Sequence, residues 1–167
     1  PVNPMNLAEE LKHYITDSGA KVAITSADLA LELAKASNTL PQADALEHMV
    51  VTQFADGFDA NVQGPDAPPE AWRSWLLGER EAALLSHGTV HPWVKAVACT
   101  DAEPPHTVGR DDLAILPYTS GTTGQPKGCM HLHRSINHNS VAGTLWGAGS
   151  HESVTLAVVP MFHITGM

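Results

Sequence analysis

Residues 118–128 read Tyr118-Thr119-Ser120-Gly121-Thr122-Thr123-Gly124-Gln125-Pro126-Lys127-Gly128. The glycines of this segment permit backbone angles closed to other residues, so that successive N–H groups can converge on an anion. Its serine and threonine hydroxyls are further neutral donors. The Lys127 ammonium is a compact charge on a long stem, which suits the outer oxygens of a polyphosphate. The composition therefore predicts a phosphate-binding loop.

Two well-known phosphate loops do not fit this segment. The Walker A pattern ends in Gly-Lys-Ser/Thr, whereas here Pro126 precedes Lys127 and Gly128 follows it. The dinucleotide pattern G-x-G-x-x-G fails as well, because Gly121 and Gly124 are separated by two residues and the third glycine is not at the required offset. A plain surface turn rich in glycine, serine and threonine is the remaining alternative, although such turns rarely contain Pro-Lys-Gly at this offset.

The segment resembles the signature of the adenylate-forming superfamily, which includes acyl-CoA synthetases, adenylation domains of peptide synthetases and beetle luciferases. The continuation at 129–134, CMHLHR, is similar to the fatty-acid–CoA ligase branch. Residues 160–166, PMFHITG, are similar to the family element P-x-F-H-x-x-G. The N-terminal PVNP and the following LAEELKHYITDSGAKVAIT also look like that family, whereas residues 40–105 match it weakly.

The resemblance implies roles for individual residues. His163 would position the carboxylate or line the acyl pocket, and a helix-start histidine bonded to a backbone carbonyl is the alternative. Phe162, Ile164 and Met167 would form the wall of that pocket, or else pack in the core. The residues implied to hold the phosphates of ATP are Thr119, Ser120, Gly121, Thr122, Thr123, Gly124 and Lys127.

The resemblance also implies an activity. The enzyme would be an ATP-dependent acyl-CoA synthetase that uses Mg²⁺. It would convert a carboxylic acid to an acyl-adenylate and then transfer the acyl group to CoA. In the fatty-acid branch the carboxylic acid is a fatty acid. Residues 1–167 would be an internal part of its large N-terminal domain, without the small C-terminal domain, and we expect no ligase activity from this part alone. A peptide-synthetase adenylation domain and a non-catalytic nucleotide-binding scaffold are the alternatives.

Composition excludes several other classes of protein. The chain has 167 residues, 43% of them hydrophobic, which is enough to bury a core, and its formal net charge is −9. This acidic balance argues against a nucleic-acid-binding surface. The sequence contains no apolar run of about eighteen residues and no leader pattern, so we expect a cytoplasmic protein without a transmembrane segment.

Cys99 and Cys129 are expected to be reduced thiols in or near the core. The sequence leaves the oligomeric state open.

Helical and strand patterns alternate along the chain. This alternation predicts an α/β fold with a mostly parallel sheet flanked by helices. A helix capped by Asn6, with Glu9 three positions on, should end at Gly19, and a second should hold Leu29, Leu33 and Ala36 on one face. The predicted helices are 6–19, 28–37, 68–86, 94–99 and 134–148, and the predicted strands are 21–25, 47–54, 113–119, 129–133 and 153–159, with 55–69 a loop. For 94–99 the spacing of Trp93 and Val97 favours a helix, and a strand is the alternative.

Three further patterns could indicate chemistry. In open α/β sheets ligands collect outside the carboxyl ends of strands, so we expect the loop after Thr119 and the element at His163 to line one site. His131, His133 and His138 form H-x-H-x4-H, but this motif lacks the supporting ligands of a zinc site, and we assign no metal to it. Asp111 and Asp112 precede a strand and are expected to form a solvated turn rather than an acid/base pair.

Overall fold

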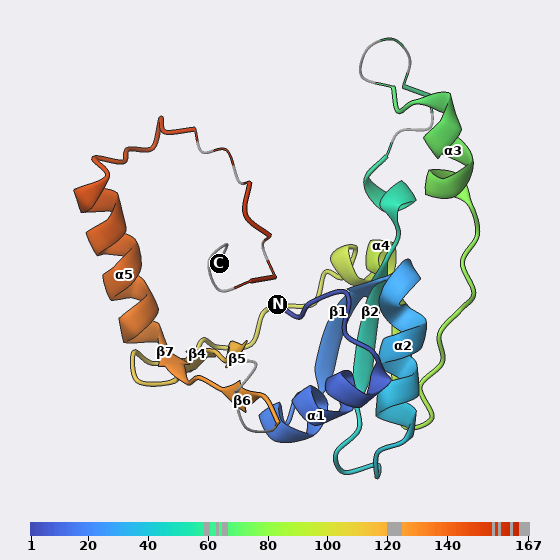
Figure 1. Cartoon of the computed structure of the whole chain (residues 1–167), viewed down its shortest axis with the longest axis horizontal. Helices are drawn as coiled ribbons and strands as arrows, with labels where there is room; N and C mark the ends of the chain where they lie inside the picture. Colours follow the sequence, from blue (N-terminus) through green and yellow to red (C-terminus); the bar gives the residue numbers. More distant parts are fainter. Residues whose placement is uncertain are drawn as a thin grey trace. The chain divides into compact units, whose positions relative to one another are not determined.

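The computed structural model describes residues 1–58, 61–62, 64, 67–119, 125–154, 156, 158–160 and 162–163 (Figure 1). The chain divides into two compact units. The N-terminal unit is Met5–Asp101, and the C-terminal unit comprises Pro1–Pro4 and Ala102–Met167. No helix within the described ranges is both long and apolar enough to cross a membrane.

A parallel sheet forms the centre of the N-terminal unit. Its three strands have the order β1-β2-β3, and both neighbouring pairs are parallel. The strands are β1 (Val22–Ser26), β2 (His48–Thr52) and β3 (Thr89–Pro92), and the helices are α1 (Ala8–Ser18), α2 (Ala27–Asn38), α3 (Glu70–Leu77) and α4 (Trp93–Val97), with a 3-10 turn η1 (Phe54–Gly57). The α/β prediction is confirmed.

One face of this sheet forms the core. Met49 on β2 is fully buried and packs with Ala30 and Ala34 of α2 and with Ala83. A second cluster joins Ile15 of α1 to the end of α2 and the segment that follows it. The alanines of α2 are short, so the helix can approach the strands closely. Burying a side chain the size of methionine contributes about 1.5–3 kcal/mol.

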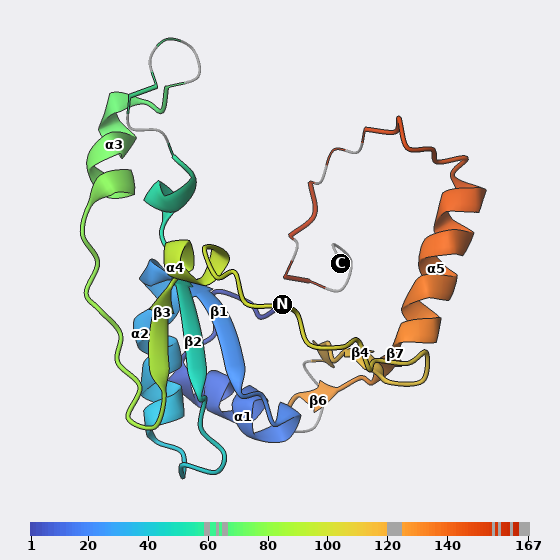
Figure 2. The same ribbon diagram turned by 180° about the vertical axis from the view of Figure 1, so that it is seen from behind.

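The opposite face of the sheet is open within this unit. Figure 2 shows α1 and α2 behind the strands and none of the unit's described helices in front of their central part. Val22 and Ile24 point to this face and are 58% and 67% exposed, so β1 is only half-buried rather than buried as predicted. Leu29, which was predicted to share a face with Leu33 and Ala36, is 36% exposed, because α2 turns its alanines to the sheet.

The N-cap of the first helix lies one residue later than predicted. The backbone N–H of Leu7 donates to Glu10 Oε2 at 3.0 Å, so Leu7 and Glu10 take the places predicted for Asn6 and Glu9. The predicted end is confirmed, because Gly19 has φ 66°, a left-handed conformation that glycine adopts without strain.

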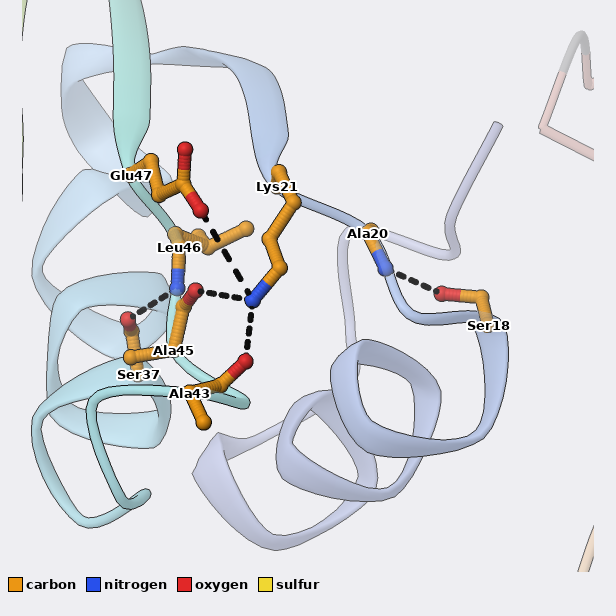
Figure 3. Close-up of polar contacts among 8 residues, drawn as sticks. All are labelled: Ser18, Ala20, Lys21, Ser37, Ala43, Ala45, Leu46 and Glu47. Carbon is orange, nitrogen blue, oxygen red and sulfur yellow. Dashed lines mark hydrogen bonds and ion pairs between the residues drawn. The ribbon is translucent and has the colours of Figure 1, made fainter.

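Polar contacts fix the segment between α2 and β2 (Figure 3). The buried Ser37 hydroxyl accepts a hydrogen bond of 3.0 Å from the Leu46 N–H. The Lys21 ammonium donates to the carbonyl oxygens of Ala43 and Ala45 and lies 3.9 Å from Glu47 Oε1. These bonds set where β2 begins beside β1.

The second half of the N-terminal unit differs most from the prediction. The predicted helix 68–86 is shorter, since α3 ends at Leu77 before Gly78, and the predicted loop 55–69 begins with the turn η1. The helix expected at 94–99 is confirmed as α4, one residue earlier. The strand β3 directly before it was not predicted.

The C-terminal unit contains two small antiparallel sheets and one helix. β4 (Leu113–Ile115) pairs with β7 (His131–Leu132), β5 (Tyr118–Thr119) pairs with β6 (Lys127–Gly128), and α5 covers His133–Trp146. The predicted strand 113–119 is therefore two strands in different sheets. The strand predicted at 129–133 is β7 and is shorter, and α5 confirms the last helix.

Two predictions for this unit are wrong. The described residues between Ser153 and Val159 form no strand. Cys129, like Cys99 of the other unit, is a free and exposed thiol rather than a core residue.

Candidate functional site

The glycine-rich segment connects two paired strands. β5 enters the segment and β6 leaves it, with Tyr118 opposite Gly128 and Thr119 opposite Lys127. Between them, Ser120, Gly121, Thr122, Thr123 and Gly124 lie outside the described residues. The segment therefore connects the two strands of an antiparallel hairpin. The prediction that it follows a strand of the parallel sheet is wrong.

The described ends of the segment place two predicted site residues side by side. The Thr119 hydroxyl donates to the Lys127 carbonyl oxygen at 3.5 Å, and both residues are exposed. None of the ion pairs between described residues involves Lys127. Thr119 and Lys127 are thus cross-strand neighbours at the two ends of one loop, and the Lys127 ammonium is the cationic group that these ends offer to an anion.

Close contacts at Gly128 and Cys129 support the exit of this hairpin. A Cβ atom on Gly128 would lie 2.9 Å from Leu116 Cγ, so glycine allows β6 to pass close to the Leu116 side chain, which lies between β4 and β5. The next residue, Cys129, donates its N–H to the Pro117 carbonyl at 2.8 Å. Pro117 has no N–H to donate, which coincides with the break between β4 and β5.

Asp111 and Asp112 belong to the support of the hairpin. Asp111 Oδ1 lies 3.0 Å from Arg134 Nη1 at the start of α5, and Asp112 Oδ2 accepts the Gly109 N–H at 2.6 Å. Backbone bonds from His133 to Asp112 and from Arg134 to Arg110 join the same turn to α5. Both carboxylates are exposed and engaged locally, which agrees with the predicted turn.

His163 is the last described residue of the predicted acyl-pocket element. Its N–H donates to the Pro160 carbonyl at 3.0 Å, and its side chain is exposed, while Phe162 is 36% exposed. Ile164 and Met167 lie outside the described residues. No strand is formed by the described residues that precede this element, so the expectation that two strand ends bring His163 and the loop together has no support in the fold. The role of His163 stays a prediction.

The motif H-x-H-x4-H spans different elements. His131 lies on β7, His133 is the first residue of α5, and His138 lies further along the same helix. Across the described ranges, no group of three His, Cys, Asp or Glu side chains could hold a metal ion.

A small hollow lies near the carboxyl ends of β1 and β2 in the N-terminal unit. Its lining includes Asp28, Phe54 and Arg80. The Arg80 guanidinium donates to Asp28 Oδ1 at 2.6 Å and to the carbonyls of Gly78 and Trp75 at 2.8 and 2.7 Å. Because these donors bind the protein itself, Arg80 ties the end of α3 to the start of α2. Sequence patterns gave no signal for this contact, whose members are 52 residues apart.

Comparisons with known proteins match the whole chain to one family. The family model described as AMP-binding enzyme matches residues 1–167. The chain is 31% identical to 4-coumarate–CoA ligase 1 of rice (Oryza sativa subsp. japonica) over 169 residues, which cover 97% of the chain and 24% of that protein. It is 29% identical to the long-chain-fatty-acid–CoA ligase FadD13 of Mycobacterium tuberculosis over 170 residues, which cover 100% of the chain and 26% of that protein. The chain thus spans about a quarter of the length of these relatives.

A solved structure has the same fold. It is the A domain of carboxylic acid reductase from Segniliparus rugosus, in complex with AMP and a co-purified carboxylic acid. The TM-score is 0.58 at 22% identity, and the match covers 99% of this chain and 26% of that one.

Proposed function

Because the chain belongs to the AMP-binding enzyme family, we propose that it is part of an adenylate-forming acid–CoA ligase. The enzyme activates a carboxylic acid in two steps. A carboxylate oxygen attacks the α-phosphorus of ATP and pyrophosphate leaves, which gives the acyl-adenylate. The thiol of CoA then attacks the acyl carbon, and AMP leaves with the electrons of the broken C–O bond.

The glycine-rich hairpin has the chemistry to bind the departing pyrophosphate. The observation that carries the proposal is the sequence of residues 118–128 on a β5–β6 hairpin, which places the Thr119 hydroxyl and Lys127 at its two ends. Negative charge grows on the β- and γ-phosphates as the α-phosphorus bond breaks, so fixed donors around them stabilise the transition state. We assign this role to Thr119, Ser120, Gly121, Thr122, Thr123, Gly124 and Lys127.

Mg²⁺ enters as part of the substrate MgATP. This ion commonly binds through substrate phosphates, retained waters and one or two carboxylates. The hairpin carries hydroxyls and an ammonium but no carboxylate between Tyr118 and Gly128. We therefore assign no residue of this chain to the metal.

His163 is proposed to position the acid. An imidazole beside the acyl-adenylate bond can donate a hydrogen bond to a carboxylate oxygen and so orient it for attack. The resemblance of PMFHITG to the family element supports this role, with Phe162, Ile164 and Met167 as candidate pocket walls.

Two classes of acid are represented among the relatives. Proteins named as 4-coumarate–CoA ligase and as long-chain-fatty-acid–CoA ligase match at nearly equal identity, 31% and 29%. The similarity therefore supports an acyl or aryl acid in general. The fatty-acid substrate and the cytoplasmic location stay predictions of the sequence.

The proposal is tested by acid-dependent ATP–pyrophosphate exchange in the full-length enzyme. The acids to compare are a hydroxycinnamate, fatty acids of increasing length and a set of amino acids. We expect exchange with a hydroxycinnamate or a fatty acid, and AMP release when CoA is added. Exchange with amino acids alone would favour a peptide-synthetase adenylation domain, and absence of exchange with every acid would favour a nucleotide-binding scaffold.

A further inference from the structure

Two histidines that are far apart in the sequence meet on the open face of the N-terminal sheet. His48 lies on β2 and His91 on β3. The Nδ1 atom of His48 is 3.2 Å from Nε2 of His91, and the ring centroids are 5.3 Å apart. We propose that this histidine pair is a binding site for a divalent transition-metal ion such as Ni²⁺, Cu²⁺ or Zn²⁺.

The strand register explains why the two rings meet. His48 pairs with Thr89 and His91 pairs with Val50, so the histidines are diagonal neighbours. Side chains alternate along a strand, so His48 and Val50 share one face while Met49 points to the other. Met49 is buried against α2, which leaves the histidine pair on the side that this unit's helices do not cover (Figure 2). His48 is exposed and His91 half-buried, so an ion can reach them from solvent.

The separation of the two nitrogens suits a shared ion. Zinc–imidazole bonds are about 2.0–2.1 Å long, so two nitrogens on a tetrahedral ion lie roughly 3.3–3.4 Å apart, and two at a right angle roughly 2.9 Å apart. The observed 3.2 Å lies between these values. Without an ion, the same geometry allows one ring to donate a hydrogen bond to the other. To bind an ion, the donor ring must instead carry its proton on its other nitrogen. Nδ1 of His48 and Nε2 of His91 then both have a lone pair for the ion.

The site offers two protein ligands and leaves the other positions to water. Within the described part of the chain no third His, Cys, Asp or Glu completes the set. The neighbours on this face include Val22, Ile24 and Val50, which do not compete for the ion. A two-imidazole chelate follows the usual order of divalent ions, so Cu²⁺ should bind more tightly than Ni²⁺ or Zn²⁺. A bound ion would cross-link β2 to β3 and stabilise the folded unit.

The test is isothermal titration of the untagged 167-residue chain with Ni²⁺. We expect one ion per chain, a higher melting temperature with Ni²⁺ and reversal by a chelator. His48→Asn and His91→Asn should each weaken binding at least tenfold. His131→Asn and His133→Asn, which alter the histidine motif visible in the sequence, are the matched controls and should bind as the parent chain does.

A second measurement does not depend on variants that fold. Substoichiometric Cu²⁺ added to the unaltered chain should broaden the NMR signals of the His48 and His91 rings before those of the other eight histidines. The proposal is overturned if Ni²⁺ does not bind, if binding survives both His48→Asn and His91→Asn, or if Cu²⁺ first broadens the signals of His131 and His133.

Discussion

The two units of the molecule differ in how far their described side chains are buried. Every buried side chain that the structure describes lies between Ile15 and Ala83, in the N-terminal unit. The C-terminal unit has the glycine-rich hairpin, and on its helix α5 Leu145 and Trp146 are 77% and 94% exposed. Substitutions in the core of the first unit should therefore lower the free energy of unfolding more than substitutions in the hairpin, which we expect to change catalysis.

The largest change in stability should follow Met49→Ala. Met49 is fully buried, so its truncation loses transfer free energy and leaves a cavity against α2. We expect a loss of about 4 kcal/mol in the free energy of unfolding, measured by urea denaturation. Met130 in the other unit is 73% exposed, and Met130→Ala should change the same quantity by about 0.5 kcal/mol or less. Equal losses of free energy of unfolding in the two variants would show that the two methionines contribute equally to stability.

A pair of glycines sharpens the comparison. A Cβ atom on Gly88 would lie 2.6 Å from the backbone oxygens of Leu46 and Glu47, which cannot rotate away. Gly88→Ala should therefore cost about 3 kcal/mol in the free energy of unfolding. In the hairpin, Gly128→Ala would meet only the Leu116 side chain, which can change rotamer, and should cost about 1 kcal/mol. A larger loss for Gly128→Ala than for Gly88→Ala would contradict this ranking.

A smaller effect is expected for Ser37→Ala. The hydroxyl is buried, and its removal leaves the Leu46 N–H without its acceptor (Figure 3), a loss of about 2 kcal/mol. Amide hydrogen exchange at Leu46 should accelerate correspondingly. Ser18→Ala is the control, because the Ser18 hydroxyl is exposed and water can replace its contacts. Unchanged protection at Leu46 would mean that the serine does not hold the start of β2.

Local patterns predicted most of the N-terminal elements. The spacing of apolar residues identified α1 and α2, and the β-branched runs identified β1 and β2. The strand β3 was missed because it has only four residues and ends in Pro92. A short run that contains proline gives a weak strand pattern. The exposure of Val22 and Ile24 could not be predicted, since it depends on which face of the sheet the helices cover.

The sequence identified the residues of the candidate site but not the strands that hold them. The composition of residues 118–128 identified a loop, yet the predicted strand 113–119 gave no sign that its two ends belong to different sheets. Lys127 was assigned to the loop, whereas it lies on β6 opposite Thr119. The pairing of His48 with His91 was also hidden, because the two are 43 residues apart and only the strand register brings them together.

The most direct test of the central claim is to measure catalysis and stability on the same Lys127→Ala variant of the full-length enzyme. Loss of a hydrogen bond from a charged donor is worth about 1.5–3 kcal/mol, so we predict an ATP–pyrophosphate exchange rate roughly 10- to 100-fold lower. The melting temperature should equal that of the unaltered enzyme. Lys95→Ala removes another exposed ammonium, from the N-terminal unit, and should leave both quantities unchanged. Full exchange activity in Lys127→Ala, or a loss matched by Lys95→Ala, would contradict the assignment of the hairpin to the phosphates of ATP.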